Sequence, residues 1–181
     1  MAVMIDIETL DTQPTAIVLS LGACRFDYNV EELKLSREDV FYTTFNVDEQ
    51  AQAGRTASWS TIKWWFKQSK EAFQAVSGDD SPPFREALND FAGWLQREPA
   101  TAIWGNGSDF DNVILANLYR TAGMEPPWNF WDNRCFRTFK NVHDVLNSRK
   151  PVEPKVKHHA LQDAIFQAEW LIGIFKKIHE G

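Results

Sequence analysis

The sequence predicts a mixed α/β domain in which helices cover a sheet. Three observations support this: three apolar runs open the chain, helical periodicity takes over from Ser58, and 181 residues suit one domain. Residues 1–181 are therefore expected to form a single domain.

The opening apolar runs are expected to be strands. They span residues 2–7, 17–27 and 40–47, and each stops at acidic or polar residues, as buried strands do. A fourth strand is expected at 101–104, before the break at Gly105, and a short fifth strand at 129–132.

Helices are expected where apolar residues recur at three- and four-residue spacing: 58–69, 84–96, 109–121, 134–146 and 160–178. Ser58 is a candidate N-cap for the first of them. Proline-bearing segments, 77–83 and 151–157, are expected to be loops.

Composition restricts the class of protein. The formal net charge is -6, so no overall basic field points to a nucleic acid, although carboxylates that hold metal ions would add such negative charge. Cys24 and Cys135 lie in no metal-binding spacing, which predicts neither a disulfide framework nor a zinc knuckle and fits a reducing cytoplasm. The N-terminus reaches Asp6 before any apolar run long enough for a signal peptide or membrane span, so no membrane association is expected.

The first acidic motif is Asp6-Ile7-Glu8, at the end of the first strand. Residues two apart on an extended chain point to the same face, so both carboxylates can reach one metal ion. The motif alone is a weak signal, because a chance Asp-x-Glu in a chain of this size is about an even bet.

Two further motifs stand at helix starts. Asn106-Gly-Ser-Asp-Phe-Asp111 opens one helix, where Asp109 could be a cap and Asp111 a solvated acid favoured by the helix dipole. His158-His-Ala-Leu-Gln-Asp163 opens the last helix, and its residues alone leave open which histidine matters.

Together the motifs resemble the three Exo motifs of the DEDDh (DnaQ-like) 3′-5′ exonucleases in the ribonuclease H-like superfamily. Asp6-x-Glu8-Thr9 is similar to the first, Phe110-Asp111 to the end of the second, and the His-x-x-x-x-Asp ending at Asp163 to the third. The resemblance runs in the right order from residue 4 to about residue 170. It implies a ribonuclease H-like fold, with a mixed five-stranded sheet flanked by helices.

The resemblance also resolves two choices. The resemblance assigns the motif histidine to His158 rather than His159, and the motif aspartate to Asp111 rather than Asp109. The second motif commonly has Asn four residues before its Asp, but Gly107 stands there, so the role of Asn106 stays open. The blocks 104–112 and 64–68 further resemble the RNase AS-like and phage exonuclease A-like branch.

The resemblance implies a mechanism with two divalent ions per site. Asp6 would bridge the ions, Glu8 and Asp163 would complete the site of one, Asp111 would hold the other through water, and His158 would act as general base. Hard oxygen ligands without cysteine favour Mg²⁺ or Mn²⁺. The products would be nucleoside 5′-monophosphates released from single-stranded 3′ ends of RNA or DNA.

Substrate contacts are expected beside the carboxylates. The resemblance places Thr9 against the terminal sugar and Leu10 as a wedge against the last bases, and Phe110 is a further candidate for substrate binding. Leu10 and Phe110 could instead be core residues. Trp59, Ile62 and Trp65 form a core-like stripe, which leaves Trp64 as the candidate for base stacking.

Basic side chains that could bind phosphate are Arg137, Lys155 and Lys157, although each could also be an ordinary solvated charge. A homodimer, whose partner would add basic residues, is compatible with the resemblance. A DNA-end or proofreading exonuclease is the nearest alternative, because the carboxylates do not discriminate RNA from DNA. A noncatalytic nucleic-acid-binding module on the same fold is a further alternative.

Overall fold

The computed structural model describes residues 1–27, 34–76, 80–141, 150–154 and 157–180. Its sheet has five strands in these ranges, in the spatial order β3-β2-β1-β4-β5. The strands are β1 (Ala2–Thr9), β2 (Val18–Asp27), β3 (Lys34–Thr44), β4 (Ile103–Gly105) and β5 (Asn133–Cys135). Neighbours are antiparallel from β1 to β3 and parallel from β1 to β5, so the expected mixed five-stranded sheet is confirmed.

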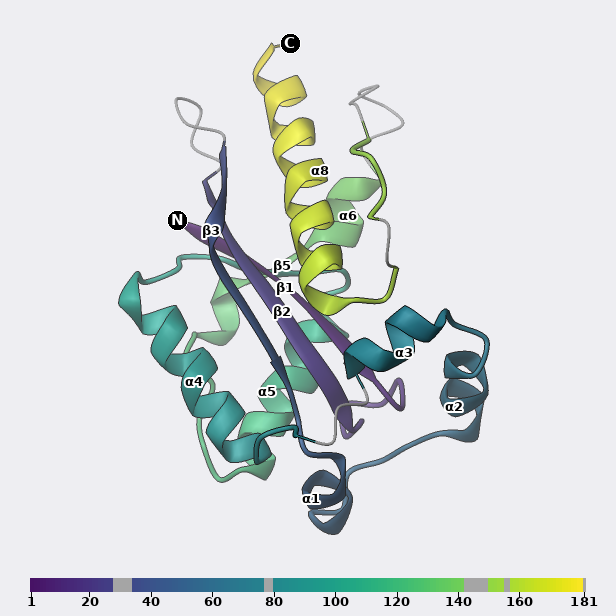
Figure 1. Ribbon diagram of the computed structural model, residues 1–181. Coiled ribbons are helices and arrows are strands. Elements are labelled where there is room, and N and C mark those ends of the chain that lie inside the picture. Colours follow the sequence, from purple (N-terminus) through teal and green to yellow (C-terminus); the bar gives the residue numbers. More distant parts are fainter. Residues whose placement is uncertain (28–33, 77–79, 142–149, 155–156, 181) are drawn as a thin grey trace.

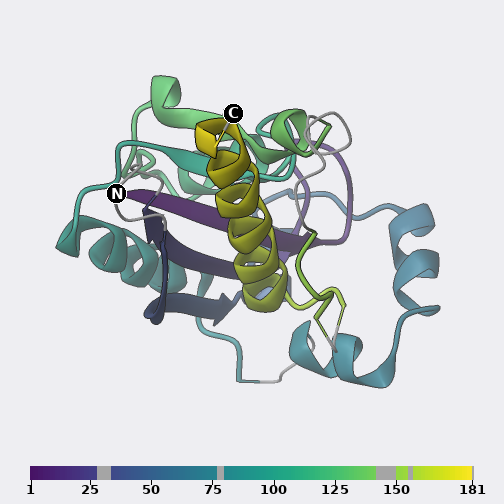
Figure 2. The same cartoon turned by 90° about the horizontal axis from the view of Figure 1, so that it is seen from above.

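Helices cover both faces of this sheet (Figure 1). The last helix, α8, lies with α6 on one face, and α4 and α5 lie on the other. Figure 2 shows α8 crossing the strands, with α3 near its N-terminal end and α2 farther from it. The helices are α1 (Val47–Gln52), α2 (Trp59–Trp65), α3 (Lys70–Val76), α4 (Phe84–Arg97), α5 (Asp111–Thr121), the 3₁₀ turn η1 (Phe130–Asp132), α6 (Phe136–Lys140) and α8 (Ala160–Glu180).

Successive side chains of β1 point to opposite faces of the sheet and so contact different helices. Val3, Ile5 and Ile7 pack into the core beneath α4 and α5. Met4 packs with α8 on the opposite face. Asp6 and Glu8 continue the series of Met4, so β1 directs both carboxylates toward the α8 side.

Several element boundaries differ from expectation. The third strand ends at Thr44 because Asn46 caps α1, with its Oδ1 accepting the backbone N–H of Glu49 at 2.9 Å. The strand expected at 129–132 is η1, closed by reciprocal bonds between Asn129 and Asp132, and β5 follows it.

Other expectations failed on burial or fall outside the described ranges. Helix α3 was not expected, and its buried residues are Ala72 and Val76. The predicted core stripe is wrong for Trp59, which is 64% exposed, and right for Trp65, which is 3% exposed. Of the expected helix 134–146, the first residues belong to β5 and only Phe136–Lys140 form a helix, α6. Its residues 142–146, like loop residues 77–79 and Lys155, lie outside the described ranges. None of the helices in the described ranges is long and apolar enough to cross a membrane.

Candidate active site

Four carboxylates from three distant parts of the chain line one cavity of about 310 Å³. Asp6 and Glu8 come from β1, Asp111 from the start of α5, and Asp163 from the first turn of α8. The same cavity is lined by His158, Asn106, Phe110, Arg137, Lys140 and Gln167. The cavity therefore collects all five residues that the sequence assigned to catalysis.

Gly22 lets α8 approach the sheet beside Asp6. In the β1–β2 ladder Gly22 is the partner of Asp6, and a Cβ on Gly22 would stand 2.1 Å from the backbone nitrogen of Leu161. The first turn of α8 thus rests directly on β2. One turn further along, Nε2 of Gln167 donates a hydrogen bond to Oδ1 of Asp6 at 2.7 Å.

Asp111 is tied to the same strand from the other side. Its Oδ1 accepts the backbone N–H of Ile7, between the two β1 acids, at 3.3 Å. Its side chain is 2% exposed, and Oδ2 is buried without a hydrogen-bond partner in the described part of the chain. Burying a carboxylate oxygen without a partner costs folding free energy, unless a cation or a hydrogen-bond donor contacts it.

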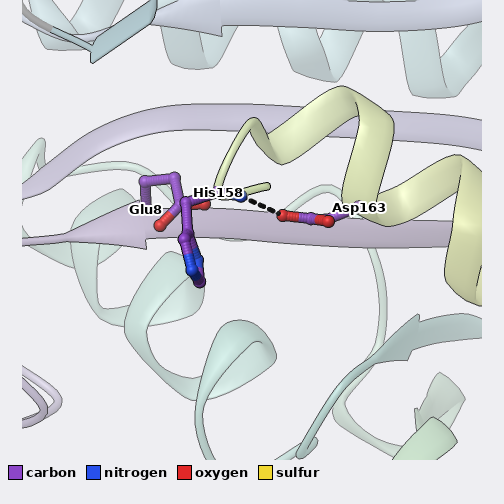
Figure 3. Close-up of side chains that lie close together, drawn as sticks. All are labelled: Glu8, His158 and Asp163. Carbon is purple, nitrogen blue, oxygen red and sulfur yellow. Dashed lines mark hydrogen bonds between the residues drawn. The ribbon is translucent and has the colours of Figure 1, made fainter. Parts of the chain in front are cut away.

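His158 and Asp163 are joined at the entrance to α8. The backbone N–H of His158 donates to Oδ2 of Asp163 at 2.9 Å, as the dashed line in Figure 3 marks. His158 has a φ of 61°, a left-handed conformation that is unfavourable for a residue with a Cβ. One ligand atom each from Glu8, His158 and Asp163 lies within 4.8 Å of the other two.

Burial and mutual repulsion raise the pKa values of the acids. Burial raises the pKa of Glu8 to about 8, with Asp163 and Asp111 adding to the rise. Burial also raises the pKa of Asp111 to about 7, against the lowering effect of the Ile7 N–H and of Arg137. The pKa of Asp6 lies well above its ordinary value through burial and the charges of its carboxylate neighbours.

The two groups at the start of α8 shift as well. Burial raises the pKa of Asp163, although the charge and backbone N–H of His158 oppose this. Burial lowers the pKa of the His158 imidazole, and the charge of Lys157 adds to the lowering while Asp163 opposes it. The neutral imidazole is therefore the favoured form near neutral pH.

The donor set fits divalent metal ions. Carboxylate oxygens that converge in one cavity repel one another, and a cation would relieve this repulsion and complete Oδ2 of Asp111. Oxygen ligands without thiolates suit hard ions such as Mg²⁺ and Mn²⁺. The four acids could hold such ions, and Glu8, His158 and Asp163 already have ligand atoms within 4.8 Å of one another.

Arg137 fills the space that a side chain on residue 107 would take. Gly107 has a φ of +119°, and a Cβ there would stand 2.8 Å from Nη2 of Arg137. The same Nη2 donates to the backbone oxygen of Asn106 at 2.6 Å. The sequence departs from the Exo pattern at this Gly, and an Asn there would need this unfavourable backbone conformation and would meet the guanidinium group of Arg137. Asn106 lines the cavity, and its Oδ1 is buried without a partner in the described ranges.

A second cavity of about 400 Å³ adjoins the acidic one. It shares Ile7, Glu8 and Phe110 with it, and its other lining residues are Thr9, Thr12, Ser60, Thr61 and Trp64. Thr9, Phe110 and Trp64 were candidates for substrate binding, and all three face this space. Leu10 instead packs, partly buried, against the cluster that contains Leu19 and Trp65, so at least part of its side chain belongs to the core.

Sequence reasoning missed the roles of Gln167 and Gly22. Gln167 follows Asp163 by four residues on one helix, so helical spacing alone could have placed both on one face. No comparable local signal marks Gly22, because its close neighbour Leu161 comes from the other end of the chain.

Comparisons with known proteins identify the family of this chain. Residues 1–175 match the family described as 3′-5′ exoribonuclease Rv2179c-like domain. An exodeoxyribonuclease of Enterobacteria phage T4 is 30% identical over 156 residues, which cover 75% of this chain and 68% of the phage protein.

Two solved structures share the fold. The nuclease domain of 3′hExo, a DEDDh family member bound to rAMP, has a TM-score of 0.64 at 12% identity, covering 99% of this chain and 92% of that chain. Cell-death related nuclease 4 (CRN-4) has a TM-score of 0.62 at 13% identity and covers all of this chain. This chain spans 65% of the length of CRN-4, slightly less than two thirds. The ribonuclease H-like DEDDh nuclease fold is thereby confirmed, and the chain belongs to the 3′-5′ exoribonuclease Rv2179c-like family of 3′-5′ exonucleases.

Proposed function

We propose that this protein removes nucleotides one at a time from the 3′ ends of single-stranded RNA and releases nucleoside 5′-monophosphates. The observation that carries the proposal is the convergence of Asp6, Glu8, Asp111, Asp163 and His158 on one cavity. RNA is put first because the matching family is described as exoribonuclease. In this proposal residues 1–181 act as one exonuclease domain in the cytoplasm, where the free thiols of Cys24 and Cys135 would stay reduced.

Asp6, Glu8, Asp111 and Asp163 would hold two Mg²⁺ or Mn²⁺ ions. Bound ions would supply positive charge at the scissile phosphate and lower the pKa of water. His158 would accept the proton of the attacking water at an imidazole nitrogen, for which its neutral form is required. The 3′ oxygen of the shortened strand would then leave the phosphorus.

The remaining side chains would bind and orient the strand end. Arg137 and Lys140 line the acidic cavity and can donate to phosphate oxygens. Thr9, Phe110 and Trp64 line the adjoining cavity, where a terminal sugar and base would lie. Leu10 would contact the last base only through the part of its side chain that the core leaves exposed. A homodimer would add basic groups to an acidic chain, and sedimentation would show whether it forms.

DNA is the second candidate substrate, because the phage relative is an exodeoxyribonuclease. The test is to incubate the protein with RNA and DNA strands of the same sequence, each labelled at the 5′ end, with Mg²⁺ or Mn²⁺. The RNA proposal predicts a ladder that shortens from the 3′ end faster on RNA. A faster ladder on DNA would make DNA the substrate, and binding without any shortening would favour a noncatalytic module.

A further inference from the structure

The ring of Trp64 contacts the ring of His158. The two centroids are 4.6 Å apart and the planes stand at 79°, an edge-to-face arrangement that aromatic pairs favour. Trp64 belongs to α2, whereas His158 precedes α8, so the contact joins two segments that are far apart in the sequence. His158 lines the acidic cavity and Trp64 the adjoining one, and Glu8 lines both cavities.

The position of Trp64 is fixed by its neighbour. Nε1 of the buried Trp65 donates to the backbone oxygen of Thr9 at 2.9 Å. Thr9 directly follows Glu8, so this bond anchors α2 to the end of the acidic strand. The rings of Trp64 and Trp65 pack edge to face with centroids 5.1 Å apart. Through Trp65, the ring of Trp64 that contacts His158 is held in a defined place relative to β1.

The imidazole of His158 needs such a contact. The hydrogen bond from its backbone N–H to Asp163 holds the main chain, which has a left-handed φ of 61°. That bond involves only the main chain and does not hold the side chain, whereas the Trp64 ring lies against the imidazole itself. Proton transfer requires the accepting nitrogen to be placed within hydrogen-bond distance of its water.

Trp64 also forms part of the wall of the adjoining cavity, together with Ser60, Thr61 and Thr9. We infer that Trp64 is a positioning residue that acts through His158: it sets the orientation of the imidazole and couples that orientation to occupancy of the adjoining cavity. The inference rests on the proposed function, because it takes His158 as the general base.

The alternative is that Trp64 only stacks on a substrate base. The two roles differ in what they change: a stacking residue changes mainly KM, whereas a residue that orients the base changes mainly kcat. They also differ in a double-mutant cycle, because a residue that acts through His158 has nothing left to orient once the imidazole is removed.

The experiment compares Trp64→Leu, Trp64→Phe, His158→Ala and the double variant Trp64→Leu/His158→Ala by single-turnover cleavage of a 5′-labelled single strand. Trp59→Leu, on the same helix and 64% exposed, is the matched control and should keep wild-type kinetics. Trp64→Leu should lower the maximal rate roughly 10- to 100-fold with a smaller change in KM. Trp64→Phe should recover most of the loss, and adding Trp64→Leu to His158→Ala should change the maximal rate little.

A measurement without catalysis accompanies the kinetics. The imidazole proton resonances of His158, assigned by their loss in His158→Ala, should shift in Trp64→Leu because the indole ring current is removed. The inference would be overturned if Trp64→Leu lowered the maximal rate by the same factor in the wild type and in His158→Ala, or if it changed KM alone. Either result would leave the proposed function intact. A wild-type rate in His158→Ala would instead remove the general-base role of His158 and with it this inference, while the exonuclease activity itself would stand.

Discussion

The guanidinium group of Arg137 occupies the volume in which a side chain on residue 107 would lie. Gly107 permits this through its missing Cβ and its φ of +119°. From this place Arg137 bonds to the backbone oxygen of Asn106, and its charge lowers the pKa of Asp111. One glycine thus brings a cation to the edge of a cavity whose other charged groups are mostly acids.

Gly107→Ala should therefore impair activity by displacing Arg137. The new Cβ meets the end of a flexible side chain, so the fold should survive, with a backbone strain of about 1–3 kcal/mol. KM should rise, and Arg137→Ala should raise it roughly tenfold or more through the lost charge-assisted bond to phosphate. Steady-state kinetics and thermal melts measure both effects.

Gly54→Ala is the matched control for this prediction. Gly54 also has a positive φ, of +82°, but a Cβ there would meet nothing within 4 Å. It should lower the melting temperature and leave kinetics unchanged. Equal kinetic losses in Gly54→Ala and Gly107→Ala would show that strain, and not Arg137, is responsible.

Without metal, the stability of the protein should fall as pH rises. The pKa of Glu8 moves from 4.5 to about 8 on folding, and that of Asp111 from 3.8 to about 7. Each acid binds its proton more tightly in the folded chain than in the unfolded chain. The protonated acid therefore adds fully to the free energy of unfolding below its unfolded-state pKa, and this contribution is lost as pH rises through its folded-state pKa. Melting temperatures in EDTA should therefore decline between pH 4.5 and about 8.

Metal should reverse this decline, because ions bind the deprotonated folded form. A free ion concentration about 100-fold above Kd raises the free energy of unfolding by about 2.7 kcal/mol. Asp111→Asn should melt higher than wild type in EDTA, with a smaller decline with pH and less gain from Mg²⁺. A pH-independent wild-type melting temperature in EDTA would contradict the clustering of the acids.

Gln167→Leu should weaken the site although no sequence motif includes this residue. Its Nε2 holds Oδ1 of Asp6 at 2.7 Å, and the loss of such a partner typically costs roughly 10- to 100-fold in metal affinity or activity. The half-saturating Mg²⁺ concentration should increase accordingly. Gln162→Leu, an exposed glutamine on the same helix, is the control. Unchanged metal dependence in Gln167→Leu would mean that Asp6 is oriented without it.

His158→Ala should reduce the rate roughly 10²- to 10⁴-fold, the usual contribution of positioned proton transfer. His159→Ala should do far less, because the ring of His159 packs against Tyr42 with centroids 4.7 Å apart. Since burial lowers the pKa of His158, the wild-type single-turnover rate should rise with pH and level off once the imidazole is neutral. A stronger loss in His159→Ala would mean that the third motif was assigned to the wrong histidine.

Local patterns predicted the fold where the pattern and the packing agree. The apolar run of β1 is a buried strand, and Ser58 does cap α2, with its Oγ accepting the N–H of Thr61. Prediction failed where few residues are buried: α3 buries Ala72 and Val76 and so carries little helical periodicity. It also failed at Trp59, whose side chain is exposed although its spacing matched that of Trp65.

Only the part of the site that lies in sequence motifs was predicted. The four acids and His158 could be found from the resemblance of three ordered motifs to the Exo motifs, and they do line one cavity. The contact between Trp64 and His158 and the close approach of Arg137 to Gly107 join segments distant in sequence. Single-sequence spacing contains no signal for such contacts, because they depend on how the helices pack on the sheet.

The most direct test of the account is the identity and metal dependence of the released product. A single-stranded RNA labelled at its 3′-terminal nucleotide is incubated with wild type and with Asp6→Asn, each in Mg²⁺ and in EDTA. The account predicts labelled nucleoside 5′-monophosphate from the wild type in Mg²⁺ alone and none from Asp6→Asn, whose melting temperature in EDTA should equal or exceed that of wild type. Release of product by Asp6→Asn at a rate near wild type, or by the wild type in EDTA, would contradict it.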